Sequence, residues 1–191
     1  EAVETMTELI EYYKGIFTIL SSCASRQLEE VTFRRTVIPV QELLDAAGKY
    51  FKKSMKNRSE RIELEIEPME AKVIGDVNQL RFLLENLIDE ALTVREDGLI
   101  RLQARQDNEY IRFLFTDTRR EKSVEELNQL FYPNLARMTS GEKGELRGTE
   151  YLVCKQIIRD HDEFAGRRGC RINAEPAEGG GFTVYFTIPR R

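Results

Sequence analysis

The chain has 191 residues, of which 41% are hydrophobic and 32% are charged, and its formal net charge is −4. This composition is typical of a folded globular protein and lacks the basic excess by which proteins bind nucleic acid. No apolar run is long enough to span a bilayer, and no signal segment opens the chain, so we expect a cytoplasmic location without membrane contact. The first residue is Glu1 and falls within a helical pattern, from which we expect a longer parent protein.

The cysteines and the histidine exclude several kinds of site. Cys23, Cys154 and Cys170 are odd in number and show no C-x-x-C spacing, so the sequence supports neither a disulfide framework nor a zinc site. We expect them to be small core residues. His161 is the only histidine, which excludes a centre with several histidine ligands, and a lone histidine near a helix end is expected to be structural.

The first predicted element is a helix with a heptad pattern. Its apolar residues recur at alternating steps of four and three, at Ala2, Met6, Leu9, Tyr13, Ile16, Leu20 and Cys23. This spacing is typical of one seam of a coiled coil. A single helix of this kind is not stable alone, so the seam packs either on its own copy in a homodimer or on the body of the domain. We therefore divide the chain into a dimerisation-type helix at 1–32 and one domain at 33–191.

The next part of the chain predicts two helices and the strands beside them. Residues 36–39 form a short extended piece before a helix at about 40–56. The apolar residues of 62–66 alternate with charged ones, which is typical of a strand with one solvent-exposed face. The clearest helix is predicted at 77–94, and its broad apolar stripe must face a sheet. The stripe consists of Leu80, Leu83, Leu84, Leu87, Ile88, Ala91 and Leu92.

The second half predicts two hairpins and two further helices. "GLIRLQAR" and "YIRFLFTD" flank the polar turn "QDNE", and "CRINAEPAEGGGFTVYFTIP" closes the chain as the second hairpin. "VEELNQLF" and "TEYLVCKQIIRDH" predict helices, with the mobile, glycine-containing loop "NLARMTSGEKGELRG" between them. We therefore expect an α+β fold, a two-layer sandwich with a mainly antiparallel mixed sheet and helices on one face, preceded by one long N-terminal helix.

In this order, four segments resemble the C-terminal region of a sensor histidine kinase, namely the second dimerisation helix and the ATPase domain shared with gyrase B. "VIGDVNQLRFLLENLIDEAL" is similar to the family's Gly-Asp segment and the helix ending in Asn-Leu-x-x-Asn-Ala. "FLFTDTRREKSVEELNQLFYP" is similar to the strand ending in Asp-x-Gly-x-Gly and the helix that follows it. "GTEYLVCKQIIRDH" and "GGGFTVYFTIP" are similar to the last glycine motif with its helix and to the final hairpin. The resemblance covers nearly the whole chain and implies a sandwich of the histidine-kinase/gyrase-B ATPase type.

The resemblance maps the family's nucleotide pocket onto eight positions of this chain: Asn86, Glu90, Thr93, Asp117, Arg119, Glu121, Gly148 and Glu150. The first three lie at helical spacing along the predicted helix at 77–94. Glu90 replaces an asparagine that helps to hold Mg²⁺ in the family, and Thr93 replaces a lysine. A carboxylate can bind Mg²⁺, so Glu90 is a candidate metal ligand. The alternative is that Glu90 belongs to a solvated acidic face with Glu85 and Asp89.

The later positions depart further from the family. Asp117 matches the acceptor for the adenine amino group. Arg119 and Glu121 replace two glycines at which backbone and ligand approach closely, so their side chains are expected to fill or reshape the adenine end. Gly148 matches the first glycine of the next motif, whereas Glu150 replaces the second. Of the five most demanding positions only Asp117 and Gly148 match, and the glutamates add negative charge beside the phosphates.

Three functions remain open. The preferred hypothesis is a degenerate histidine-kinase-like domain, a pseudokinase in a two-component signalling protein, with weak or no ATP binding and no cofactor. The second is a divergent active kinase that uses ATP and Mg²⁺, with Glu90 as metal ligand and Arg119, Arg120, Lys122 or Lys143 on the phosphates. The third is an inert structural dimer unit. Whether the chain is an enzyme is therefore left open by its sequence.

The same resemblance implies partners and a setting. The pseudokinase would act as a relay, as a homodimer through the N-terminal helix and with a response regulator or another signalling protein. It would be the cytoplasmic part of a larger, membrane-anchored sensor. The family's phosphate-accepting histidine lies upstream of the residues present here, so this part of the protein is not expected to phosphorylate itself in the family's usual manner.

Overall fold

The computed structural model describes residues 2–7, 9–10, 13–14, 32–132, 139–140, 146–147 and 149–191. The described residues before 15 are helical, as the heptad pattern predicts for the start of the chain, and they are exposed. Ile16, Leu20 and Cys23, which complete the predicted seam, lie outside the described residues. In the part of the chain that is described, no helix combines the length and the apolar character needed to cross a membrane.

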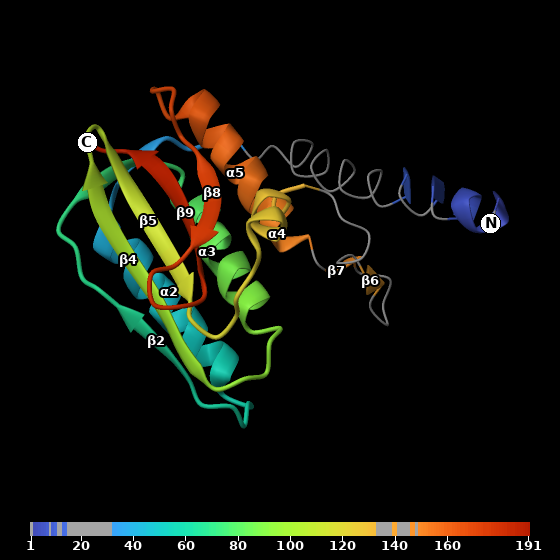
Figure 1. Ribbon diagram of the computed structural model, residues 1–191. Helices are drawn as coiled ribbons and strands as arrows, with labels where there is room; N and C mark the ends of the chain where they lie inside the picture. The colour runs from blue at the N-terminus through green and yellow to red at the C-terminus, as the bar shows by residue number, and fades with distance from the viewer. Residues whose placement is uncertain are drawn as a thin grey trace.

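A five-stranded sheet forms one layer of the domain (Figure 1). Its order is β2 (Ile62–Ile66), β4 (Gly98–Asp107), β5 (Tyr110–Asp117), β9 (Phe182–Pro189), β8 (Ile172–Pro176). Strand β4 pairs antiparallel with β5, and β8 with β9, which confirms both predicted hairpins. The two hairpins join through the antiparallel pair β5 and β9, whereas β2 runs parallel to β4.

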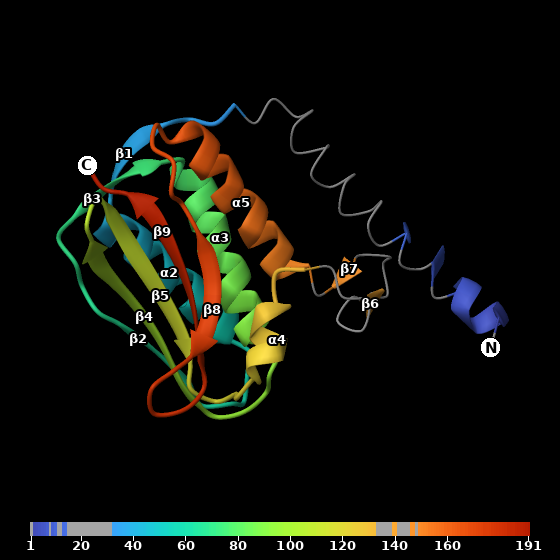
Figure 2. The same cartoon turned by 45° about the horizontal axis from the view of Figure 1, so that its top comes forward.

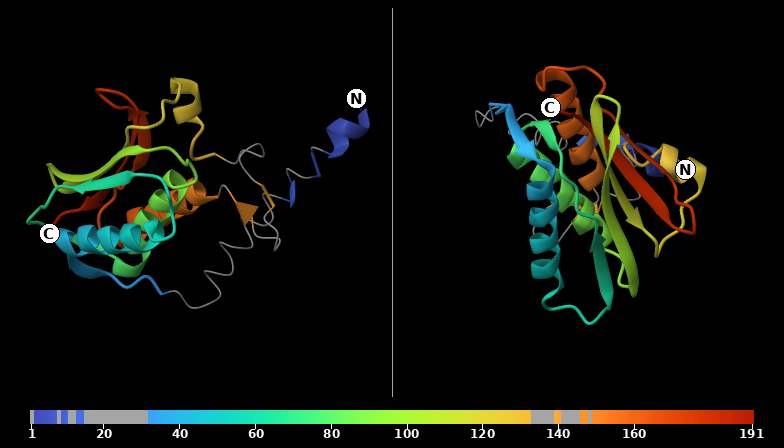
Figure 3. Two further views of the ribbon diagram at one scale, coloured as in Figure 1. Left: turned by 90° about the horizontal axis from the view of Figure 1, so that it is seen from below. Right: turned by 90° about the vertical axis from the view of Figure 1, so that its left-hand side faces the viewer.

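Three helices form the second layer and cover one face of the sheet (Figures 2 and 3). They are α2 (Val40–Met55), α3 (Val77–Ala91) and α5 (Glu150–Phe164). The short helix α4 (Val124–Asn128) lies beside β8 and begins with a capping box between Ser123 and Glu126. A further short pair, β6 (Thr139–Ser140) and β7 (Leu146–Arg147), is antiparallel. The expected two-layer α+β sandwich is therefore confirmed.

Besides β6 and β7, which lie in the predicted loop, one strand of the domain was not predicted by the sequence pattern. β3 (Lys72–Gly75) pairs antiparallel with β1 (Thr36–Pro39) in a separate two-stranded sheet. Its four residues are too few for a period-2 pattern to stand out, and the partner strand is more than 30 residues away in the sequence. This small sheet joins the start of the domain to the residues that lead into α3.

The core lies between the two layers and follows the predicted alternation. Ile111, Phe113 and Phe115 of β5 are buried, and so are Phe186 and Ile188 of β9. The rings of Phe113 and Phe186, which face each other across the two strands, are stacked with centroids 4.8 Å apart. From the helices, the seven apolar residues predicted for the stripe of α3 are all buried.

Helix α3 is shorter than the predicted range of 77–94, because it ends at Ala91. Asp76 caps its start by accepting hydrogen bonds from the backbone N–H groups of Asn78 and Gln79. At the other end, the N–H groups of Thr93 and Val94 bond to carbonyls three residues back, which is a turn rather than an α-helix. Both residues are β-branched and therefore favour the helix interior less than the leucines before them. The apolar pattern continues past Ala91, which explains why the predicted helix extended to residue 94.

His161 ties this start of α3 to α5. It is fully buried, its Nδ1 lies 2.8 Å from the carbonyl oxygen of Ile157, and its Nε2 accepts a hydrogen bond from the backbone N–H of Asp76 at 3.1 Å. These partners fix a neutral imidazole with the proton on Nδ1. Burial lowers the pKa of His161, which keeps the ring neutral. The expected structural role of this histidine agrees with its contacts.

Candidate functional site at the end of strand β5

The candidate site is built around Asp117, the last residue of β5. The alternation of this strand places Ile111, Phe113, Phe115 and Asp117 on its buried face. The carboxylate therefore points into the interior at the end of the central strand of the sheet, and the residue is 1% exposed. A buried carboxylate must be paired or hydrogen-bonded to stay ionised.

The partner of Asp117 is Arg119, two residues later. Arg119 Nε donates to Asp117 Oδ1 at 2.9 Å, and Arg119 Nη2 donates to Oδ2 at 3.0 Å, which makes a bidentate pair. The backbone N–H of Arg119 donates to Oδ1 as well, at 3.0 Å. Both side chains are almost completely buried, with 1% exposure for Arg119 and 2% for Asp117. The arginine therefore lies inside the domain, contrary to the usual solvent-facing position of such charged runs.

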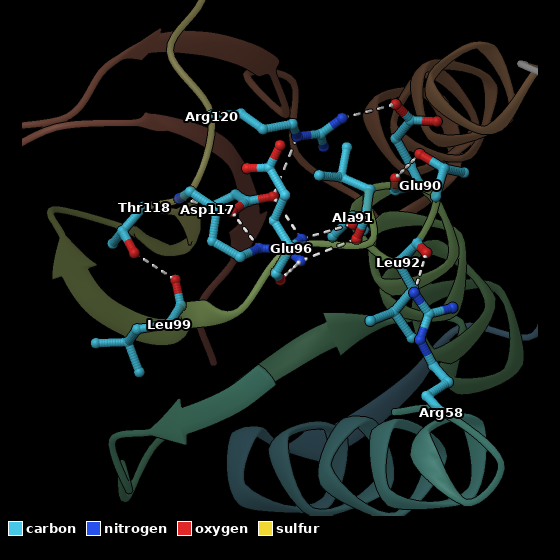
Figure 4. Close-up of polar contacts among 12 residues, drawn as sticks. Arg58, Glu90, Ala91, Leu92, Glu96, Leu99, Asp117, Thr118 and Arg120 are labelled. Atoms are coloured by element: carbon cyan, nitrogen blue, oxygen red, sulfur yellow. Dashed lines mark hydrogen bonds and ion pairs between the residues drawn. The ribbon is translucent and has the colours of Figure 1, made fainter. Parts of the chain in front are cut away.

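The guanidinium of Arg119 also binds the chain that leaves α3. Nη2 donates to the carbonyl oxygen of Ala91 at 2.6 Å, and Nη1 donates to the carbonyls of Val94 at 3.1 Å and Glu96 at 3.0 Å. A guanidinium has five N–H donors, and these three bonds with the two to Asp117 use all five. The positive charge lies at the C-terminal end of α3, where the helix dipole favours it. Figure 4 shows how these contacts converge between Asp117, Ala91 and Glu96.

Arg120 extends the network to Glu90. Its Nε donates to Asp117 Oδ2 at 3.2 Å, and its Nη1 lies 3.6 Å from Glu90 Oε1 (Figure 4). The guanidinium is also above the ring of Phe182, 5.5 Å from the centroid. The cluster of Glu90, Asp117, Arg119 and Arg120, called the Arg–Asp cluster below, therefore contains two acidic and two basic groups.

The buried Tyr151 of α5 lies close enough to this cluster to be affected by its charges. Burial and the negative charge of Glu90 raise the pKa of Tyr151, which keeps its hydroxyl protonated. A neutral phenol adds no charge to the site.

The other predicted site residues are not gathered as the helical spacing suggested. Asn86 is buried, and its Nδ2 donates to the carbonyl of Phe82 in its own helix. Thr93 is exposed and lies past the end of α3, where its Oγ1 donates to the carbonyl of Glu90. Of the three residues predicted to form a polar line, Glu90 is the one that pairs with Arg120. The prediction of one continuous line on the helix was wrong because the helix ends before Thr93.

The two other predicted glutamates lie away from α3. Glu121 is exposed, and its Oε1 is 3.7 Å from the position of a Cβ built on Gly180, at the turn before β9. Glu150 is the first residue of α5, where the helix dipole favours a carboxylate. Its Oε2 is buried and has no hydrogen-bond partner among the residues that the structure describes. Gly148 lies outside the described residues.

In this arrangement the carboxylate of Asp117 is occupied by arginine N–H groups. A carboxylate offers about four lone-pair positions. Asp117 already accepts four hydrogen bonds, three from Arg119 and one from Arg120. The carboxylate of Glu90, the candidate metal ligand, faces the guanidinium of Arg120. Within the described part of the chain, no three His, Cys, Asp or Glu side chains form a group that could hold a metal ion.

Sequence reasoning missed the groups that hold Arg119. Three of them are backbone carbonyls, which carry no residue signature. The fourth is Gly98 at the start of β4, which leaves room for the Arg119 side chain because a Cβ there would lie 2.5 Å from Cγ of Arg119. A second arginine, Arg58, donates from Nη2 to the carbonyl of Leu92 at 2.8 Å and so binds the same turn from the side of α2 (Figure 4). Of these groups, Gly98 alone could have been noticed in the sequence, because a glycine at the start of a strand indicates a close approach by another part of the chain.

Comparisons with known proteins agree with the fold. The family model for histidine kinase-, DNA gyrase B-, and HSP90-like ATPases matches residues 75–191. No curated protein sequence matches the chain. Among solved structures, the catalytic domain of histidine kinase ThkA is similar at 21% identity and a TM-score of 0.62, over 82% of this chain and 97% of that one.

Two further solved structures are similar at comparable levels. The mycobacterial sensor histidine kinase MprB is 20% identical, with a TM-score of 0.62 over 83% of this chain and 99% of that one. The Acinetobacter baumannii histidine kinase AdeS is 15% identical, with a TM-score of 0.61 over 98% of this chain and 79% of that one. At these identities the likeness establishes the fold, and the site must be judged from its own residues.

Proposed function

Because this chain belongs to the family of histidine kinase-, DNA gyrase B- and HSP90-like ATPases, we propose that it is a pseudokinase member in which the protein's own arginines have replaced the nucleotide. It functions as a relay domain of a two-component signalling protein, through its dimerisation helix and its surface rather than through ATP turnover.

The observation that carries this proposal is the saturation of Asp117. Adenine binding would require one of its oxygens to release an arginine N–H. That release would leave a buried guanidinium N–H without an acceptor, for which the cost is about 1–3 kcal/mol and more for a charged group. A hydrogen bond from the adenine amino group to the carboxylate contributes about 1.5–3 kcal/mol. The exchange therefore gives the nucleotide no net gain at Asp117.

The charge of the remaining positions supports the same proposal. Glu90 and Glu150 are carboxylates at positions matched to metal and phosphate contacts in the family, and Glu121 replaces a glycine at the adenine end. The positive charges beside Asp117 are already engaged within the Arg–Asp cluster. Within the described part of the chain, Arg119 and Arg120 are therefore not free to bind a triphosphate, which would meet the acidic groups.

The proposed partners are a second copy of the chain and a response regulator. The N-terminal helix exposes several large apolar side chains, and such an exposed apolar surface is typical of a protein–protein contact. They are Val3, Met6, Leu9, Ile10 and Tyr13. The similar kinase ThkA has been solved in complex with the response regulator protein TrrA, at 19% identity and a TM-score of 0.64. A chain without residues 1–30 is expected to be monomeric in light scattering, whereas the full chain is expected to be dimeric.

Calorimetric titration of the full chain with Mg-ATP and Mg-ADP tests the proposal, with the melting temperature as a second readout. We expect no heat of binding and no change of Tm at millimolar nucleotide. A ligand at about 100 times its Kd would stabilise the fold by about 2.7 kcal/mol, which both methods detect. Submillimolar affinity together with ATP hydrolysis would overturn the proposal.

The competing function is a divergent active kinase. The similar protein ShkA has been solved full-length in complex with AMPPNP, at 15% identity and a TM-score of 0.64, and this chain spans 37% of that one. An active site here would need Glu90 to bind Mg²⁺ and Arg120 to turn from Asp117 to the phosphates. If the wild type binds Mg-ATP and Glu90→Ala does not, the active kinase is the correct description. The exposed Glu63→Ala provides the matched control.

A further inference from the structure

We infer that the pocket at the end of β5 is a guanidinium-binding site, that Arg119 is its tethered ligand, and that a free alkylguanidinium ion occupies it when Arg119 is truncated. This inference rests on the proposed function, since it assigns the ligand class of the same pocket. The inference is that the pocket binds a guanidinium ion, whereas the proposed function is that the pocket does not bind a nucleotide.

The acceptors of the pocket match the donor pattern of a guanidinium. The two carboxylate oxygens of Asp117 accept from Nε and Nη2, which is the side-on geometry of a bidentate carboxylate pair. The carbonyls of Ala91, Val94 and Glu96 accept the other three N–H groups at 2.6–3.1 Å. Five acceptors around one planar cation leave no N–H unsatisfied.

The pocket is formed by elements that are far apart in the sequence. Asp117 ends a strand, and the three carbonyls belong to the last residue of α3 and the segment after it. The backbone of Gly98 lies beside the aliphatic part of Arg119. The guanidinium and the carboxylate are 1% and 2% exposed, so the contact is not a surface ion pair. Truncation of Arg119 beyond Cβ removes none of these acceptors, because they belong to other residues.

The charge and donor count decide which ligands the pocket accepts. Without Arg119, the cluster keeps the carboxylates of Glu90 and Asp117 and the single cation of Arg120, so its net charge becomes −1. A monovalent cation restores neutrality. An alkylammonium ion has one nitrogen and cannot reach acceptors on opposite sides, and an alkylurea is neutral. Adenine offers an amino group but also ring nitrogens that are acceptors, which the backbone carbonyls cannot satisfy.

The experiment is chemical rescue of Arg119→Ala in the full chain. Truncation at Cβ removes Cγ, Cδ and the guanidinium, so ethylguanidinium is the matching probe. We expect a saturable rise of Tm with millimolar ethylguanidinium that recovers at least half of the Tm lost on truncation. Ethylammonium and ethylurea at the same concentrations are expected to recover less than a tenth of it.

Two controls separate a specific site from a general solvent effect. The wild type, whose pocket is filled, is expected to show no rise of Tm. Arg101→Ala removes an arginine that pairs with Glu65 at 3.8 Å on the exposed side of the sheet, and it is expected to show no rescue. If Arg119→Ala is unfolded without ligand, the same titration is read as recovery of far-UV circular dichroism. Arg119→Gly then serves as the second variant, because it restores the glycine that the family has at this position.

Each outcome bears on the inference separately from the proposed function. Equal rescue by ethylammonium, or no rescue by ethylguanidinium, overturns the guanidinium site even if the wild type fails to bind nucleotide. Stabilisation of Arg119→Ala by Mg-ADP but not by ethylguanidinium also overturns it, because the pocket would then be a masked purine site. Nucleotide binding by the wild type instead contradicts the proposed function itself.

Discussion

Gly98 and Arg119 occupy complementary space at the start of β4. A Cβ on Gly98 would lie 2.5 Å from Cγ and 3.1 Å from Cδ of Arg119, and the backbone of Gly98 has a φ of 146°. Real Cβ atoms do not approach other atoms so closely, and L-residues rarely adopt this φ. The glycine therefore provides the passage by which Arg119 reaches Asp117.

Substitution of Gly98 by alanine is expected to destabilise the domain through this contact. In the wild type, Gly98→Ala introduces both a steric conflict with the Arg119 side chain and an unfavourable φ. In the Arg119→Ala background the conflicting atoms are absent, so only the unfavourable φ remains. The two substitutions should therefore be coupled, with a double variant more stable than the sum of the single effects by about 0.5–3 kcal/mol. Urea denaturation of the four proteins measures this coupling. Additive effects would show that Arg119 does not pass beside Gly98.

The charge of Asp117 is expected to be essential for the stability of the fold. Asp117→Asn leaves Arg119 buried without a counter-charge, which should lower the free energy of unfolding by about 3–5 kcal/mol. Asp107 lies at the other end of the same hairpin, where it pairs with Arg112 at 2.8 Å with both side chains 37% exposed. Asp107→Asn is therefore the matched control, and its effect should be within about 1 kcal/mol. Similar effects of the two substitutions in chemical denaturation would contradict the buried pair.

His161 is expected to make the fold sensitive to mild acid. Its pKa is lowered by burial in the folded protein, whereas in the unfolded chain it protonates near about 6.5. Its contribution is therefore fully present above that pH. Between the unfolded and the folded pKa the unfolded chain binds more protons, so stability should fall with decreasing pH by up to about 1.4 kcal/mol per pH unit.

This dependence can be assigned to one residue because the chain has a single histidine. The imidazole C–H resonance of the folded protein should not titrate near pH 6.5 in NMR spectra. His161→Gln should show a flatter stability profile between pH 5 and 6.5, a window chosen around the ordinary histidine pKa of about 6.5. A resonance that titrates at the ordinary value while the protein stays folded would refute the buried neutral ring.

Asp76 is expected to contribute more than an ordinary helix cap. Its Oδ1 caps α3, and its Oδ2 accepts the backbone N–H of Arg34 at 2.9 Å, which fixes the segment before β1. Asp76→Ala removes both contacts from a residue that is 3% exposed, so we expect a loss of about 2 kcal/mol or more in urea denaturation. Ser123→Ala removes the exposed cap of α4 and should cost about 1 kcal/mol. Equal losses would indicate that the contact to Arg34 adds no stability.

The sequence was sufficient for the fold because its signals are local. Period-3.6 stripes marked α2, α3 and α5, and period-2 alternation marked the strands of both hairpins, since each pattern reports which face of an element meets the core. The pattern failed where the local signal is weak. It extended α3 to 94 although the helix ends at Ala91, and it gave no strand at Lys72–Gly75.

The site was determined by the sequence only as a set of positions. The sequence identified Arg119 as a long side chain in place of a glycine, but the burial of that side chain depends on the carbonyls of Ala91, Val94 and Glu96, which lie 23 to 28 residues away. Backbone carbonyls have no residue identity, so their convergence appears only when the turn after α3 is placed beside the end of β5. The sequence thus determined which positions carry charged side chains, whereas the tertiary structure decided that the guanidinium of Arg119 lies inside the domain, because five fixed acceptors meet there.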